Sequence, residues 1–158
     1  MTPINLPFFK ADLYRQRRAE LAGRIREQSG GGIAILSTAP EQLRNRDSEF
    51  PYRHDSDFFY LTGFDEPGAT LVLQVDRNTV VAHLFCRPKD VEREIWDGLR
   101  LGPEAVPDYL GVDHANPNTE LDQELPKLLA DQTALYIRLA SSAETDRRIR
   151  HWIDRVRG

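Results

Sequence analysis

The protein has 158 residues, and its 21 Lys and Arg side chains against 25 Asp and Glu side chains give a formal net charge of −4 at pH 7. This length fits one domain, and the 40% hydrophobic and 29% charged residues are typical of a globular fold rather than a disordered chain. The mild acidity argues against a nucleic-acid-binding protein, whose domain would carry a basic surface and a high pI.

The single cysteine, Cys86, excludes an internal disulfide and gives no sign of an oxidising compartment. No uninterrupted apolar run approaches the roughly 20 residues that a membrane-spanning helix needs. Residues 1–10 also lack the basic and apolar regions of a signal peptide. We therefore expect a soluble, cytoplasmic protein that has no membrane partner.

The first predicted element is a helix over residues 10–28. Its buried face is predicted from apolar residues at helical spacing, namely Leu13, Tyr14, Leu21, Ala22 and Ile25. Its solvent face is predicted from the charged residues between them, namely Arg15, Arg18, Glu20 and Arg24. The glycines at 30–32 end this helix. They do not form a phosphate-binding loop, because the Lys-Ser/Thr pair and a following helix are missing.

Apolar and β-branched runs predict the strands of a sheet. The predicted strands cover residues 32–37, 58–62, 69–75, 79–86 and 133–139. The first of them is continuously apolar and suits a buried central position. The third and fourth are joined by a short polar turn at residues 76–78, which predicts an antiparallel hairpin.

Helical patterns return after residue 88. The predicted helices cover residues 90–96, 103–110 and 119–130, followed by a last helix that opens at a capping box over residues 141–144. Pro126 predicts a kink or a late start in the third of these. The buried face of the last helix is predicted from Ile149, Trp152, Ile153 and Val156. Strands and helices in this order predict an α/β fold, a mixed sheet with helices on both faces.

Self-contained catalytic motifs are absent from the sequence, which lacks the HExxH, GxSxG, CxxC and P-loop patterns. Three of the four histidines stand alone: His83 in a predicted strand, His114 in a predicted loop and His151 in the last helix. We expect structural or surface roles for them, because one imidazole without partners does not hold a metal ion.

The densest polar segment covers residues 45–60. Its residues of the types that bind divalent cations are Asp47, Glu49, His54, Asp55 and Asp57, but their spacing matches no EF-hand loop. Ser48 or Ser56 beside His54 would supply a nucleophile and its base, although the members of a catalytic triad usually converge from separate elements. The favoured interpretation is a loop organised by its own ion pairs, or, as a functional variant, an interaction surface.

Trp96 also has two interpretations. A core tryptophan is the default, and the alternative is an exposed anchor, since tryptophan is enriched at binding hot spots.

Two segments resemble the N-terminal domain of aminopeptidase P, the Xaa-Pro aminopeptidases. They are DSEFPYRHDSDFFYLTGFDEP at residues 47–67 and EIWDGLRLG at residues 94–102. The order of the predicted elements agrees with that domain over nearly the whole chain. The resemblance implies that residues 1–158 form one such domain, with a creatinase-like, ribonuclease-H-like α/β fold.

The resemblance also implies a parent enzyme that removes the N-terminal residue preceding proline. In that family two manganese ions lie in a separate C-terminal "pita-bread" domain, held by two Asp, one His and two Glu, and they activate a water molecule. That domain is absent from this sequence, so no catalytic residue and no metal ligand is assigned here, and the fragment alone is expected to be inactive. The expected partners are the missing catalytic domain, neighbouring subunits of an oligomer and a peptide with proline at its second position.

Asp47 and Trp96 match a loop aspartate and a tryptophan that, in the family, help to shape the substrate cleft of a neighbouring subunit. A carboxylate attracts a free α-ammonium group, and an indole offers apolar surface to a proline ring. The resemblance implies substrate-binding roles in trans for both. The alternatives are a stand-alone binding module of the same fold and a small hydrolase that uses Ser48 or Ser56 with His54.

Overall fold

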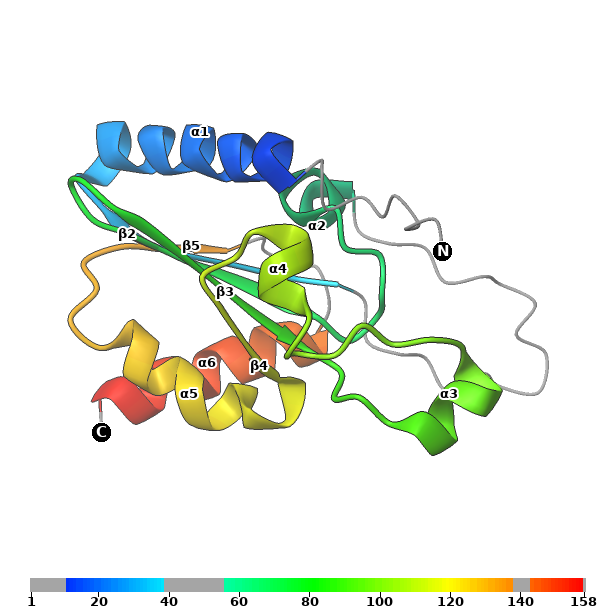
Figure 1. The fold of residues 1–158 in the computed structure, drawn as a ribbon. Coiled ribbons are helices and arrows are strands. Elements are labelled where there is room, and N and C mark those ends of the chain that lie inside the picture. The colour runs from blue at the N-terminus through cyan, green and yellow to red at the C-terminus, as the bar shows by residue number, and fades with distance from the viewer. Residues whose placement is uncertain (1–10, 39–55, 138–142, 158) are drawn as a thin grey trace.

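The structure is a computed structural model that describes residues 11–38, 56–137 and 143–157. The described residues form a five-stranded sheet in the order β4-β3-β2-β1-β5 (Figure 1). β2 pairs antiparallel with both β1 and β3, whereas the outer pairs β1–β5 and β3–β4 are parallel. The sheet is therefore mixed, as predicted. Its strands are β1 (Gly32–Ser37), β2 (Thr70–Val75), β3 (Val80–Cys86), β4 (His114–Pro117) and β5 (Leu135–Ile137).

Helices cover both faces of this sheet, and α3 stands apart from it (Figure 1). One core joins the sheet to α1, α2 and α4, and a second core joins it to α5 and α6. The helices are α1 (Ala11–Ser29), α2 (Ser56–Thr62), α3 (Val91–Asp97), α4 (Val106–Leu110), α5 (Leu121–Leu129) and α6 (Ala143–Arg157), with a 3₁₀ turn η2 (Asn118–Glu120) before α5.

The central strands place apolar side chains in both cores. In β2, Leu71 and Leu73 lie in the core under α1, whereas Val72 between them lies in the core under α5 and α6. A strand that is buried on both faces has a continuous apolar sequence, which explains why this part of the fold was predictable. The predicted bounds of β1 and the β2–β3 hairpin are confirmed.

Residues 58–62 form part of helix α2, so the predicted strand is wrong. Phe58 and Leu61 are buried, three residues apart, which is helical rather than strand spacing. Thr62 Oγ1 donates a hydrogen bond to the Phe58 carbonyl at 2.9 Å, one helical turn earlier. The aromatic residues of this segment favour strands in general, and here the packing against α1 overrides that preference.

The charged face of α1 was also predicted incorrectly at one position. Arg18 is buried with 2% of its surface exposed, whereas the predicted core residue Leu13 is exposed. The Arg18 guanidinium donates to the carbonyls of Leu61 at 2.9 Å, Leu110 at 3.1 Å and Gly111 at 3.2 Å. Burial, followed by the nearby Arg15 charge, lowers the pKa of Arg18 to about 10, so the side chain stays cationic at neutral pH. Arg18 thus binds the carbonyl ends of α2 and α4 to α1.

Helix α5 begins at Leu121, later than predicted, and keeps Pro126 in its interior. Proline has no N–H to donate to the carbonyl four residues earlier, which belongs to Asp122. Arg155 of α6 donates to that carbonyl at 3.1 Å instead. The Asp122 carboxylate also accepts a hydrogen bond from Trp152 Nε1 at 2.8 Å and from Arg148 at 3.1 Å. Asp122 therefore joins α5 to α6.

We expect the contribution of Asp122 to stability to depend on pH. Partial burial raises the pKa of this carboxyl, but the Trp152 hydrogen bond and the Arg148 charge outweigh burial and lower the pKa below its ordinary 3.8. A carboxyl with a lowered pKa stabilises the fold above pH 3.8 and loses that contribution as the pH falls through the folded-state pKa. Urea unfolding over a pH series should show wild type converging on Asp122→Asn in acid. A constant difference between the two proteins at every pH would contradict this expectation.

The last predicted elements are confirmed only in part. Strand β5 is shorter than predicted, and residues 138–139 lie outside the described residues, as do the capping-box serines 141 and 142. In α6, Ile149 and Trp152 are buried as predicted, but Val156 is exposed near the end of the helix.

Candidate functional site

Trp96 lies near the end of α3 with 86% of its surface exposed. The default interpretation as a core residue is therefore wrong. Trp96 is exposed, as the alternative requires, and its role as a binding anchor stays a prediction. Three further apolar residues of this segment are also exposed, so we call the four together the α3 surface: Val91 (70%), Ile95 (75%), Trp96 (86%) and Leu99 (86%). A group of exposed apolar side chains on one short segment is typical of an interaction site.

Helix α3 is capped at both ends by its own residues. Asp90 Oδ1 accepts a hydrogen bond from the Arg93 backbone N–H at 3.1 Å, which is the usual N-cap arrangement. At the other end Gly98 has a φ of +92° and donates its N–H to the Glu94 carbonyl at 3.1 Å. A positive φ favours glycine, so the Gly98 position ends the helix directly after the tryptophan turn.

Two side chains, Glu94 and Lys89, close the segment that carries the α3 surface. Glu94 Oε1 accepts hydrogen bonds from Lys89 Nζ and from the Arg100 backbone N–H, each at 2.7 Å. Lys89 Nζ also donates to the Arg100 carbonyl at 2.7 Å. The bond from the Arg100 N–H, and then that from Lys89, lower the pKa of Glu94, which keeps it ionised at neutral pH. We call Lys89, Glu94 and Arg100 together the neck.

Glu66 attaches both ends of the same segment to the body of the domain. Its Oε1 accepts from Arg87 Nη2 at 3.2 Å, and its Oε2 accepts from the Leu101 N–H at 2.8 Å. The Glu66 and Arg87 side chains are largely buried. Arg100, also buried, donates to the Pro88 carbonyl at 3.2 Å. Glu66, Arg87 and the neck residues were missed by sequence reasoning, although Glu66, Glu94 and Arg100 fall within the two segments that carry the family resemblance.

Asp47, the other predicted substrate-binding residue, lies outside the described residues. The same is true of Ser48, Glu49, His54 and Asp55, so the structure does not test the cation-binding and nucleophile interpretations of that segment. Ser56 and Asp57 open helix α2. Elsewhere, the described ranges contain no group of three or more His, Cys, Asp and Glu side chains that could hold a metal ion.

His83 and His114 do not stand alone as predicted. His114 lies in edge strand β4, which the sequence did not predict, and pairs with His83 of β3. Their rings stack at 5.0 Å between centroids, and His83 Nε2 lies 2.8 Å from Gln74 Oε1. Partial burial, followed by the His114 charge, lowers the pKa of His83. The lowered pKa favours the neutral imidazole. The stacking on His114 and the contact with Gln74 are what the predicted structural role requires.

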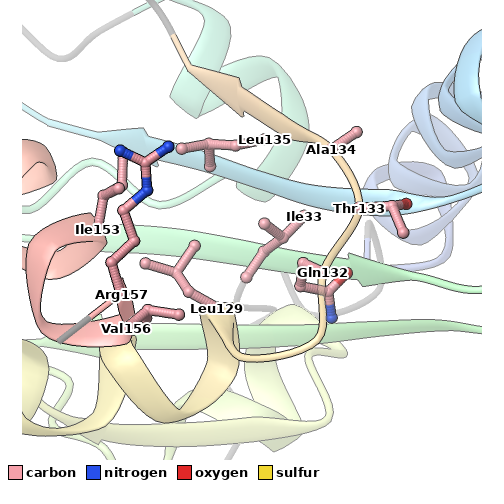
Figure 2. A pocket seen from close by; sticks show the side chains of 9 residues that line it. All are labelled: Ile33, Leu129, Gln132, Thr133, Ala134, Leu135, Ile153, Val156 and Arg157. Carbon is pink, nitrogen blue, oxygen red and sulfur yellow. The ribbon is translucent and has the colours of Figure 1, made fainter.

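The structure also contains a pocket of about 260 Å³ near the end of α6. Figure 2 shows that one side of the pocket is formed by the adjacent strands β1 and β5 and the other side by the ends of α5 and α6. Most of its lining is aliphatic, and its polar side chains are Gln132, Thr133 and Arg157. The lining includes no acid, histidine or cysteine, so it offers no general base or thiol nucleophile.

Residues 14–136 match the family described as "Aminopeptidase P, N-terminal domain". The chain belongs to this family. The aminopeptidase P N-terminal domain is 43% identical over 124 residues to an Xaa-Pro aminopeptidase of Escherichia coli and 32% identical over 133 residues to Xaa-Pro aminopeptidase 3 of Homo sapiens. These alignments cover 78% of this chain and only 27% and 26% of the two relatives.

Solved structures of the family have the same fold. A zinc-substituted E. coli aminopeptidase P in complex with product superposes on this N-terminal domain with a TM-score of 0.84 at 39% identity. A proline aminopeptidase P II from Yersinia pestis gives the same TM-score at 38% identity. Both comparisons cover 93% of this chain and 33% of the other. In the described part of the domain, no helix is both long and apolar enough to cross a membrane.

Proposed function

We propose that this chain is the non-catalytic N-terminal domain of a manganese-dependent Xaa-Pro aminopeptidase, and that it serves oligomerisation and substrate access. The family match supports the first part, together with relatives that are named Xaa-Pro aminopeptidases and are about four times longer than the matched region. The observation that carries the second part is the exposure of Trp96 on a segment fixed by Glu66 and Glu94. A cytoplasmic location is part of the same proposal.

On this proposal Trp96 enters the substrate cleft of a neighbouring subunit. An exposed indole has a large rigid apolar face, suited to contact with a proline ring or with an apolar peptide side chain. Burying it between two subunits and a substrate removes that face from water, and fully desolvated tryptophans are the residues that most often dominate binding energy. Asp47 is proposed to attract the peptide's α-ammonium group, as the family resemblance implies.

The manganese ions of the proposed enzyme belong to its catalytic domain. The described residues of this chain do not fit them, because no three metal-binding side chains converge there. No step of the hydrolysis is therefore assigned to this chain, whose proposed contribution is to hold and orient the peptide.

The experiment that tests the proposal is to read the encoding reading frame past Gly158 and to express the whole polypeptide. We expect an additional catalytic domain, manganese-dependent cleavage of Xaa-Pro peptides and an oligomer in light scattering. A stop codon directly after Gly158 would contradict the proposal and would favour a stand-alone binding module.

A further inference from the structure

We infer that Glu94 is the positioning residue for Trp96, because its carboxylate ties α3 to both ends of the loop formed by residues 89–100 and so fixes where the α3 surface stands. Its effect on substrate access rests on the proposed function, whereas this tie follows from the geometry alone.

Helix α3 needs support from outside itself. It has seven residues, and isolated helices shorter than about 12 residues are marginal in water. Figure 1 shows α3 apart from the sheet and from the helices that cover it. Its apolar residues Val91, Ile95 and Trp96 face solvent, so they do not anchor it in a core.

Glu94 supplies this support. Its side chain is only 7% exposed, whereas Trp96, two residues further on, is 86% exposed. Burying a carboxylate while exposing an indole is unfavourable unless the carboxylate is paired and hydrogen-bonded. Glu94 meets both conditions, because Oε1 accepts from Lys89 Nζ and from the Arg100 N–H, each at 2.7 Å. One oxygen thus connects the start, the helix and the end of the segment.

The role of Glu94 differs from that of Glu66. Glu66 attaches Arg87 and Leu101 to the body of the domain, outside the loop. Glu94 is itself a residue of α3 and accepts hydrogen bonds from residues on both sides of the helix, Lys89 before it and Arg100 after it. Loss of Glu94 leaves the bonds from Lys89 to the Arg100 carbonyl and from Arg100 to the Pro88 carbonyl, which still join the two ends of the loop. It removes the bonds that tie α3 to those ends, so the tryptophan samples a wider range of positions.

The test compares Glu94→Ala and Glu94→Gln with the control Glu92→Ala, which replaces an exposed glutamate in the same first turn of α3. The probe is hydrogen exchange of the Arg100 amide in the 158-residue chain. We expect Glu94→Ala to accelerate exchange about tenfold, the size of effect typical of a hydrogen bond to a charged group. Glu94→Gln should partly restore protection, since its amide oxygen still accepts from the Arg100 N–H, and Glu92→Ala should have no effect. Unchanged exchange in Glu94→Ala would overturn the inference.

A second readout asks whether Glu94 acts through Trp96. In the whole enzyme, Glu94→Ala should lower kcat/KM for an Xaa-Pro peptide, and the double variant Glu94→Ala/Trp96→Ala should lose no more than Trp96→Ala alone. Losses that simply add would overturn the positioning role. If Trp96→Ala itself leaves turnover unchanged, the proposed function is contradicted, and amide exchange alone then decides whether Glu94 ties α3 to the ends of the loop.

Discussion

Replacing Arg18 with methionine should lower the free energy of unfolding by about 3 kcal/mol or more, because it leaves three buried or partly buried carbonyls without their donor. These are the carbonyls of Leu61, Leu110 and Gly111, which end α2 and α4. Methionine keeps an unbranched apolar chain at the site, so the loss measures the hydrogen bonds more than the packing. Urea denaturation followed by circular dichroism gives the difference directly.

The matched control is Arg24→Met, on the same helix and exposed. Surface substitutions of this kind change stability by less than about 0.5 kcal/mol. Arg18→Lys should fall between the two, since a lysine keeps the charge but lacks the planar fork that reaches two helix ends at once. An Arg18→Met variant as stable as Arg24→Met would show that α2 and α4 do not depend on this residue.

Replacing Trp96 with alanine should leave the fold unchanged but cause a large loss of activity in the whole enzyme. The side chain is 86% exposed, so its removal leaves no cavity and should change stability by less than about 0.5 kcal/mol. Tryptophan hot spots contribute about 2 kcal/mol or more, which corresponds to a loss of roughly 30-fold in kcat/KM for an Xaa-Pro peptide in the whole enzyme.

Leu13→Ala controls for the loss of an exposed apolar side chain elsewhere, since Leu13 lies on α1 at a distance in the fold from α3 (Figure 1). It should leave both stability and turnover unchanged. If Trp96→Ala and Leu13→Ala have equal kinetics, Trp96 takes no part in substrate access. If Trp96→Ala is instead strongly destabilised, the residue has a structural role that its exposure does not suggest.

The central strands of the sheet were predictable because a strand that is buried on both faces needs a continuous apolar run, which can be recognised in the local sequence. β1, β2 and β3 are short apolar runs between turn residues, and each appears within one residue of its predicted bounds. Edge strand β4 carries no such run, since its side chains are only partly covered, and it forms by pairing with β3. Helix α2 was missed because its aromatic composition suggests a strand, whereas its spacing of buried residues is helical.

Arg18 and the neck show where local patterns are insufficient. A helical wheel places Arg18 on the solvent face of α1. Its burial is favourable only because the fold brings the carbonyls of Leu61 and Leu110, 43 and 92 residues further along the chain, within hydrogen-bonding distance. Glu66 likewise accepts a hydrogen bond from the Leu101 N–H, 35 residues further along the chain. Trp96 was identified through the family resemblance, because its own surroundings in the sequence are compatible with either a core or a surface position. The residues that hold it in place are connected only by the folded chain.

We claim that this domain orients substrate for chemistry performed elsewhere. The most direct test is to assay residues 1–158 alone for cleavage of an Xaa-Pro peptide. The purified chain would be stripped with a chelator, reloaded with manganese, repurified and assayed. We expect no cleavage above the buffer rate and no tightly retained manganese. Cleavage that stays with the chain through repurification, disappears with chelator and returns with manganese would contradict it.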